Sequence, residues 1–532
     1  MTQAPQQPAE YDFSKRQIFW GMVAIFAVYA TMSYFVQTLN VARPKLAAEL
    51  NGMSLYAWSV SLPGLVGAFV TLIFGKLSDI YGRRIMLLIS VIFSFIGTIL
   101  SALSPNFIFF IAASVIANLG NGAMMPLVFA VVGDMFPPAK RSKWIGLLNI
   151  PTGICSLFGP TLGGWLVDNL SWRYLFWFSL PLLVICLITV PIGVPSIITS
   201  AKRKIDILGC ILVAIASSTT IVGFSLAGTT YPWASVPVIS LLGVSLVFWI
   251  WFFRTESRVE EPILDPVVLR NRSFMTVAIA TLFSFFGQMA IMMYFPMFLQ
   301  GVQGVSATLS GQIITPYSVL MSFIGVPVGF LLARTKSYKW MYILGFSILT
   351  AVMFGVIFFT AETPVLWSVL VCTLTGLGLG AIPTVNTMVI QNAVPKRLLG
   401  VAMGGIFFAI SMGVAISPAI LGSAMNASYA KTLAASLPAG LVEAQDEATM
   451  NSLGDPKVLL SQPAMAALEE NFRKAGREAL FPQTVQAIRT SMEAGLRSVF
   501  WVSAITMLLA FLIISTVPQV SWETETRGKK GS

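Results

Sequence analysis

The stretch GKLSDIYGRR (residues 75–84) decides the fold of this chain. It lies between two apolar segments, 54–77 and 85–104, each long enough to cross a bilayer as a helix. Its glycines permit a tight turn, and its acid stands beside three bases, so we expect an exposed charge cluster that closes and breaks as helices move. A loop that only fixed orientation would need the bases alone. The predicted gating residues are Gly75, Asp79, Gly82, Arg83 and Arg84.

Composition places this loop in a membrane protein. Of the 532 residues, 56% are hydrophobic and 10% charged, whereas soluble proteins carry about 25% charged residues. The net charge of +11 comes from bases between apolar runs, so it indicates membrane orientation and not a nucleic-acid partner. We predict an all-α polytopic protein with fourteen spans, near 17–41, 54–77, 85–104, 107–135, 143–169, 173–196, 206–228, 234–253, 274–299, 309–333, 340–361, 364–392, 398–424 and 498–519.

The chain also repeats itself. The stretch beginning at Gly75 has a degenerate counterpart beginning at Gly329, PPAKR (137–141) is echoed by VPKR (394–397), and GPTLGG (159–164) by SPAILG. The near-constant offset of 254 to 258 residues indicates duplicated halves. The predicted organisation is an N-terminal tail (1–16), a six-helix bundle (17–196), two inserted helices (206–253), a second six-helix bundle (274–519) and a C-terminal tail (520–532).

Basic residues fix the expected orientation. With the N-terminus inside, 23 of the 33 Lys and Arg residues lie in cytoplasmic segments, and the short external loops hold only Arg43, Lys45 and Arg173. Both termini are therefore predicted to be cytoplasmic. The segment 425–497 is predicted to be external. It mixes apolar and charged residues at helical spacing, which suits a solvated helical hairpin or loop, or alternatively a cap that gates substrate or binds a partner.

The sequence lacks the residues of most catalytic and metal sites. It has no histidine, which removes histidine-based triads, zinc motifs and proton relays. Its four cysteines, Cys155, Cys186, Cys210 and Cys372, stand singly in apolar runs. We therefore expect no enzyme, no metal and no cofactor.

A second motif lies in the predicted fifth helix, and together with the gating loop it resembles the motifs of a known protein family. Small residues and a proline in the predicted fifth helix suit close packing and bending; they are Gly153, Gly159, Pro160, Gly163 and Gly164. Together the two motifs resemble the signature loop and antiporter motif of the major facilitator superfamily, and the helix count resembles its fourteen-helix drug:proton antiporter branch. The resemblance implies two bundles that rock around a central site, efflux of drug-like molecules, and exchange for protons.

The central helices depart from that family pattern. Phe35 and Ser114 stand where the branch usually carries an Asp and an Arg. The acids of the helices, such as Asp134 and Asp168, fall at helix ends. Proton coupling is thus implied only by the resemblance. The residues themselves predict transport that depends little on a proton gradient, or that depends on a peripheral acid.

Neutral polar side chains occupy the central helices instead. They can line a substrate cavity or hold helices together by hydrogen bonds. We interpret the stripes on the first and fourth helices as lining one cavity. The cavity candidates are Ser33, Gln37, Asn40, Ser114, Asn118, Asn121, Gln288 and Asn386.

Three functions remain open. The leading one is secondary active export of amphipathic or toxic molecules across the plasma membrane by a monomer embedded in the lipid bilayer, with a proton gradient as its possible partner. The second is uptake or facilitated diffusion of a neutral or anionic solute without proton coupling. The third is a sensor or scaffold on a transporter fold, and the complete gating loop argues against it.

Overall fold

The computed structural model describes residues 14–50, 55–195, 206–228, 231–259, 262–438, 462–474 and 478–519. Within these ranges the regular elements are all helices. Both predicted tails, apart from a few residues, lie outside the described part. The first half consists of α1 (Lys15–Glu49), α2 (Tyr56–Tyr81), α3 (Arg83–Ala102), α4 (Phe107–Met135), α5 (Pro138–Leu147), α6 (Asn149–Asn169) and α7 (Arg173–Gly193).

Two further helices separate this half from the second. They are α8 (Ile207–Leu226) and α9 (Val236–Glu256). The second half contains α10 (Pro266–Leu269), α11 (Arg272–Met289), η2 (Ala290–Tyr294), α12 (Phe295–Met297), η3 (Phe298–Val302), α13 (Ala307–Phe323), α14 (Gly325–Thr335), α15 (Lys339–Val356), α16 (Val365–Ala393), η4 (Lys396–Leu398), α17 (Leu399–Ser436), α20 (Gln462–Lys474), η6 (Glu478–Leu480) and α21 (Phe481–Ser515).

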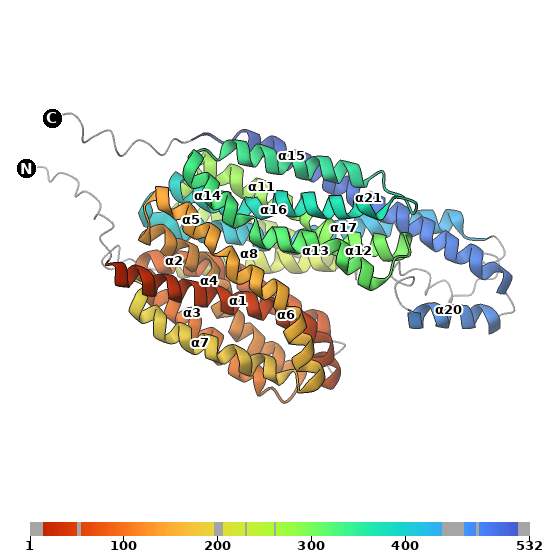
Figure 1. Cartoon of the computed structure of the whole chain (residues 1–532), viewed down its shortest axis with the longest axis horizontal. Helices are drawn as coiled ribbons and strands as arrows, with labels where there is room; N and C mark the ends of the chain where they lie inside the picture. The colour runs from red at the N-terminus through yellow and green to blue at the C-terminus, as the bar shows by residue number, and fades with distance from the viewer. Residues whose placement is uncertain are drawn as a thin grey trace, which may run out of the picture.

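The helices form two bundles that touch mainly at one end (Figure 1). The bundles meet where α1 begins and α21 ends, and they diverge toward the opposite end. We call the meeting side the closed end. Contacts between the bundles pair α2 with α17, α5 with α14, and α6 with α13. Helix α8 lies against both α2 and α17, so the inserted pair covers the boundary between the bundles.

Length and apolarity make this a multi-pass membrane fold. Among the described residues, twelve helices can cross a membrane, and a thirteenth span arises if α13 and α14, bent by 40°, are counted together. The expected all-α membrane fold is confirmed. A fourteenth span is compatible with the structure but is not established. The predicted span 143–169 corresponds to two helices, α5 and α6, which are separated at Leu148.

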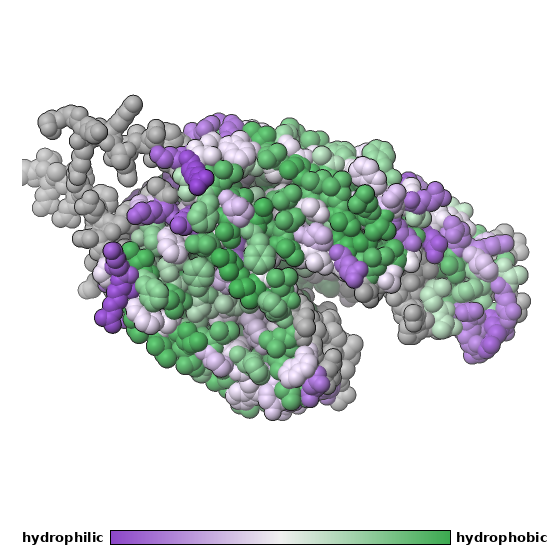
Figure 2. Space-filling model, viewed as in Figure 1, coloured by the Kyte–Doolittle hydropathy of each residue, from purple (hydrophilic) through white to green (hydrophobic). Residues whose placement is uncertain are grey.

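Packing follows the apolar composition. Figure 2 shows hydrophobic side chains covering the flanks of both bundles and polar ones gathering toward the ends, as a bilayer requires. Helix α9 is the most lipid-exposed of the candidate spans, because only 17% of its most apolar 18 residues are buried inside the protein. Its exposed side chains include Leu246, Val247 and Trp251.

The predicted external segment 425–497 is largely helical where it is described. Helix α17 continues to Ser436, and α21 begins at Phe481. Between them, α20 buries Leu468 and Phe472, and Phe472 packs edge-on against Phe481 with ring centroids 5.7 Å apart. The middle of the segment, 439–461, lies outside the described residues. The two flanking helices thus extend beyond the spans that the sequence suggested.

Candidate functional site

The gating loop is a sharp reversal between two helices. Gly82 ends α2 and precedes α3 with φ +93°, a backbone conformation that a side chain disfavours. The reversal places Asp79, on the last turn of α2, beside Arg83, on the first turn of α3. The spacing of the motif therefore positions its acid and its first arginine as a pair.

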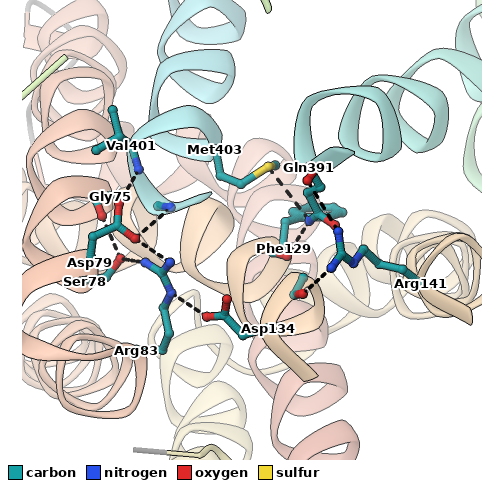
Figure 3. A network of polar contacts seen from close by, with 12 residues as sticks. Gly75, Ser78, Asp79, Arg83, Phe129, Asp134, Arg141, Gln391, Val401 and Met403 are labelled. Atoms are coloured by element: carbon teal, nitrogen blue, oxygen red, sulfur yellow. Dashed lines mark hydrogen bonds and ion pairs between the residues drawn. The ribbon is translucent and has the colours of Figure 1, made fainter. Parts of the chain in front are cut away.

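Asp79 binds the first turn of a helix in the other bundle (Figure 3). The backbone N–H groups of Gly400 and Val401 donate to its two carboxylate oxygens at 3.0 and 2.8 Å. These amides belong to the first turn of α17, where backbone N–H groups have no partner within the helix. A carboxylate there satisfies both donors and interacts favourably with the positive end of the helix dipole.

Arg83 completes the connection within the N-terminal bundle. Its guanidinium forms an ion pair with Asp79, donates to the Ser78 hydroxyl, and pairs with Asp134 of α4 at 2.8 Å. We call Asp79, Arg83, Asp134 and the amides of Gly400 and Val401 the latch. Arg84 is half-exposed, and no contact among the described residues connects it to the latch.

The latch is buried, which corrects the expectation of an exposed charge cluster. Asp79 is 6% exposed and Arg83 4%. Exposed ion pairs contribute about 0–1 kcal/mol, but leaving one charge of a buried pair unpaired costs about 3–5 kcal/mol. The sequence could not show this, because the burial comes from α17, which is more than 300 residues away along the chain.

A second buried arginine joins the bundles, and sequence reasoning did not find it. Arg141 on α5 is 2% exposed and donates to the carbonyl oxygens of Gly133 and Phe136 at 2.6 and 3.1 Å. It also reaches the Gln391 carbonyl of α16 at 3.5 Å, while the Gln391 side chain donates to the Phe129 carbonyl at 2.7 Å (Figure 3). The sequence signal at this position is PPAKR (137–141), which indicates the internal repeat but not a buried contact.

Glycines let the bundles touch at two crossings. At the first, between α2 and α17, a Cβ on Gly75 would lie 2.5 Å from the Gly400 carbonyl oxygen and 3.2 Å from the Gly404 Cα. At the second, between α5 and α14, a Cβ on Gly329 would lie 2.5 Å from the Ser142 carbonyl oxygen and 3.0 Å from the Gly146 Cα. Each crossing therefore has no room for a side chain.

The antiporter motif packs α6 against both bundles. A Cβ on Gly163 would lie 3.3 Å from the Thr38 Cα on α1, and one on Gly153 would lie 2.5 Å from the Phe323 ring on α13. Gly159 is also buried. The side-chain environments of Pro160 and Gly164, and that of Asp168, lie outside what the structure describes.

Several of the predicted cavity residues form hydrogen bonds inside their own bundles, and a role for any of them in a substrate cavity stays a prediction. Ser33 bonds to Thr152 at 3.0 Å, and the Asn118 amide donates to the Ser114 carbonyl at 3.0 Å. Asn121 accepts from Ser94 at 2.9 Å, and Gln288 donates to the Met321 sulfur at 3.6 Å. Ser114 itself is 5% exposed. The side chains of Gln37 and Asn40 lie outside the described residues.

Asn386, the last of the predicted cavity residues, bonds at both ends of its amide. It is 4% exposed, its oxygen accepts from the Tyr342 hydroxyl at 2.7 Å, and its nitrogen donates to the Thr281 hydroxyl at 2.7 Å. Both ends of the amide are thus used between helices α11, α15 and α16. In this structure Asn386 connects three helices of the C-terminal bundle, and its place in a substrate cavity stays a prediction.

A cavity of about 320 Å³ lies where α6 and α13 face each other. Hydroxyl groups and apolar groups share its wall; they come from Ser156, Leu157, Thr315, Ser318, Ser322 and Phe323. Such a mixture suits an amphipathic molecule. Gly153 of the antiporter motif also lines it, so the motif and the cavity belong to one interface between the bundles.

Comparison with known proteins agrees with this architecture. The family model described as Major Facilitator Superfamily matches residues 22–418. The chain belongs to the major facilitator superfamily. It is 27% identical over 88% of its length to the multidrug transporter protein MdtP of Bacillus subtilis, and covers 87% of that protein. It is 28% identical over 89% of its length to multidrug resistance protein 3 of the same organism, and covers 90% of it.

Solved structures agree on the fold of this superfamily member. The human organic anion transporter MFSD10 superposes over 93% of this chain and 99% of its own, with a TM-score of 0.57 and 15% identity. The proton:xylose symporter XylE covers 96% of this chain and 98% of its own, with a TM-score of 0.58 and 13% identity. At such identities the likeness concerns the fold alone. The family is one of transporters, as the gating loop predicted.

Proposed function

We propose that this superfamily member exports amphipathic or toxic small molecules by alternating access. The observation that carries the proposal is the latch, since a buried ion-pair network that closes one end between two rigid bundles is the part that must open for transport. The multidrug transporters among its relatives support drug-like substrates. The chain acts as a monomer in the plasma membrane, with the lipid bilayer and its small-molecule substrate as partners.

In this proposal both termini are cytoplasmic, so the closed end faces the cytoplasm and the structure faces outward. Orientation is tested by labelling from outside the cell. Glu469→Cys places a thiol at an exposed position of α20, and in a cysteine-free background a membrane-impermeant maleimide should label it. The same reagent should leave Tyr81→Cys at the closed end unlabelled. The reverse pattern would invert the orientation.

Transport itself is tested in inside-out vesicles. A lipophilic cationic dye should accumulate in vesicles that contain the chain and not in vesicles with Asp79→Asn. A proton gradient imposed across the membrane then separates driven export from exchange without a gradient. Equal dye uptake in empty vesicles would contradict export by this chain.

A second function, facilitated diffusion of a neutral or anionic solute, has one specific observation in its favour. Phe35 fills its position by packing against Phe176 with ring centroids 5.8 Å apart, and Ser114 is buried. No charge stands at either place to exchange protons through the central helices. Gradient-independent flux of an organic anion in the same vesicles, without dye export, would favour this function.

A further inference from the structure

Two carboxyl groups are buried where the inserted helices reach the closed end. Asp206 caps α8 by accepting from the Gly209 amide at 2.8 Å, and Glu256, the last residue of α9, accepts from the Leu264 amide at 3.2 Å. They are 9% and 2% exposed. Each carboxyl thus accepts a backbone hydrogen bond with one oxygen, and its second oxygen takes no part in that bond.

The two remaining oxygens face the same point. Asp206 Oδ2 and Glu256 Oε1 lie 2.5 and 2.9 Å from where a Cβ on Gly209 would be. Neither has a hydrogen-bond partner among the described residues. A buried acceptor without a donor is costly, and two neighbouring carboxylates in a low-dielectric site resist ionising together. A proton on Glu256 would remove one of the two charges and make its free oxygen a donor.

Lys76 places a positive charge near the pair. Lys76 of the gating loop is 5% exposed and interacts electrostatically with Glu256. Cys210, one turn along α8, also faces the two acids. Residues 196–205 and 260–261, which flank the two acids in the sequence, lie outside the described part of the chain. On the far side, Leu264 lies 3.5 Å from the Cβ position of Gly405 on α17.

We propose that Glu256, buried beside the Asp206 carboxylate, binds one proton and thereby couples the inserted helices to closure of the cytoplasmic end. With the proton bound, one carboxylate and Lys76 balance and the cluster is neutral. Without it, the cluster carries a net negative charge away from water, and opening relieves that charge because water enters. Since α8 lies on both α2 and α17, release of the proton favours separation of the first crossing. The consequence for transport rests on the proposed function, but proton binding does not.

Infrared spectroscopy of the purified chain in lipid nanodiscs tests proton binding directly. The difference spectrum between acidic and alkaline buffer should contain the carbonyl stretch of a buried protonated carboxyl. Asp206→Asn and Glu256→Gln should each abolish it, because the acid that is left pairs with Lys76. Glu362→Gln, at an exposed glutamate, should retain it. Absence of the signal in the wild type, or its survival in both single variants, would overturn the proposal.

A second measurement reads closure. Spin labels on Tyr81 and Trp340, exposed residues at the closed end, should move apart as pH rises in the wild type. Asp206→Asn and Glu256→Gln should stay closed, whereas Lys76→Met, which removes the positive charge beside Glu256, should keep the infrared signal up to a higher pH. An unchanged pH response in the two acid variants would contradict the coupling. Thermal unfolding of each variant shows that it is folded, and neither readout requires transport.

Discussion

The two glycine crossings at the closed end are almost the same contact, yet only one carries a latch. Gly75 meets the carbonyl of Gly400 and the Cα of Gly404 in the same way that Gly329 meets Ser142 and Gly146. The sequence offsets, 254 and 258 residues, are those of the internal repeat. Duplication therefore reproduced the packing of backbone on backbone at both places.

The difference lies in where the facing helix begins. Helix α17 begins at Leu399, so the amides of Gly400 and Val401 lack partners within their helix and Asp79 satisfies them. Helix α5 begins at Pro138, so the amide of Ser142 lies beyond its first four N–H groups and is used within the helix. At the position equivalent to Asp79 the chain has Ala333, and the Lys143 ammonium lies 4.9 Å from the centroid of the Phe330 ring.

We infer that the two crossings have different roles in opening and closing. The second crossing works as a pivot whose packing persists, and the first as a switch whose charges must separate. A buried charge network has two distinct arrangements, bonded or hydrated, whereas glycine packing alone has no such alternative. Substitutions at each crossing test this difference.

The largest effect is expected from filling a crossing. Gly75→Val and Gly329→Val each place side-chain atoms within 2.5 Å of a carbonyl oxygen, so each should prevent the closed end from forming and reduce transport more than tenfold. Gly64→Val on α2, where nothing lies within 4 Å of the Cβ position, is the matched control. The Tyr81–Trp340 spin-label distance measures closure, and closure retained in Gly75→Val would refute the tight crossing.

Breaking the latch should come next. Asp79→Asn removes the charge that pairs with Arg83 and caps α17, while Asp134 remains as one partner. We expect the closed state to lose up to about 3 kcal/mol, measured as a shift of the spin-label populations toward the open form. Glu362→Gln is the control. An unchanged population would mean that the motif only sets topology.

A smaller effect is expected at the contact between α4 and α16. Gln391→Leu removes the hydrogen bond that the Gln391 side chain donates to the Phe129 carbonyl, and such a bond contributes about 0.5–1.5 kcal/mol. The closed population should fall, but less than in Asp79→Asn. Asn392→Leu, a half-buried neighbour that bonds within its own helix, serves as control. Equal losses in both variants would show that Gln391 has no special role between the bundles.

Sequence patterns could predict some of these features and not others. Apolar runs and the repeat predicted the all-α membrane fold, because both are local or periodic signals. The burial of Asp79, the Arg141–Gln391 contact and the Asp206–Glu256 pair depend on which helices meet across the bundles. Asn386 shows the same limit, since a polar residue in an apolar helix reads identically whether it faces a cavity or bonds to Tyr342.

The smallest effect is expected from adding an acid to the second crossing. Ala333→Asp places a carboxylate at the position equivalent to Asp79, but the facing turn of α5 offers no free N–H groups to bind it. The spin-label populations should therefore change less than about threefold, or about 0.6 kcal/mol, and Ala333→Asn should behave alike. A tenfold gain in the closed state would show that charge alone makes a latch. If no gain is seen, the free N–H groups at the start of α17 are what distinguish the first crossing from the second. An insertion before Leu399 that extends α17 by one turn would occupy the amides of Gly400 and Val401 within the helix, so it should lower the closed population as Asp79→Asn does.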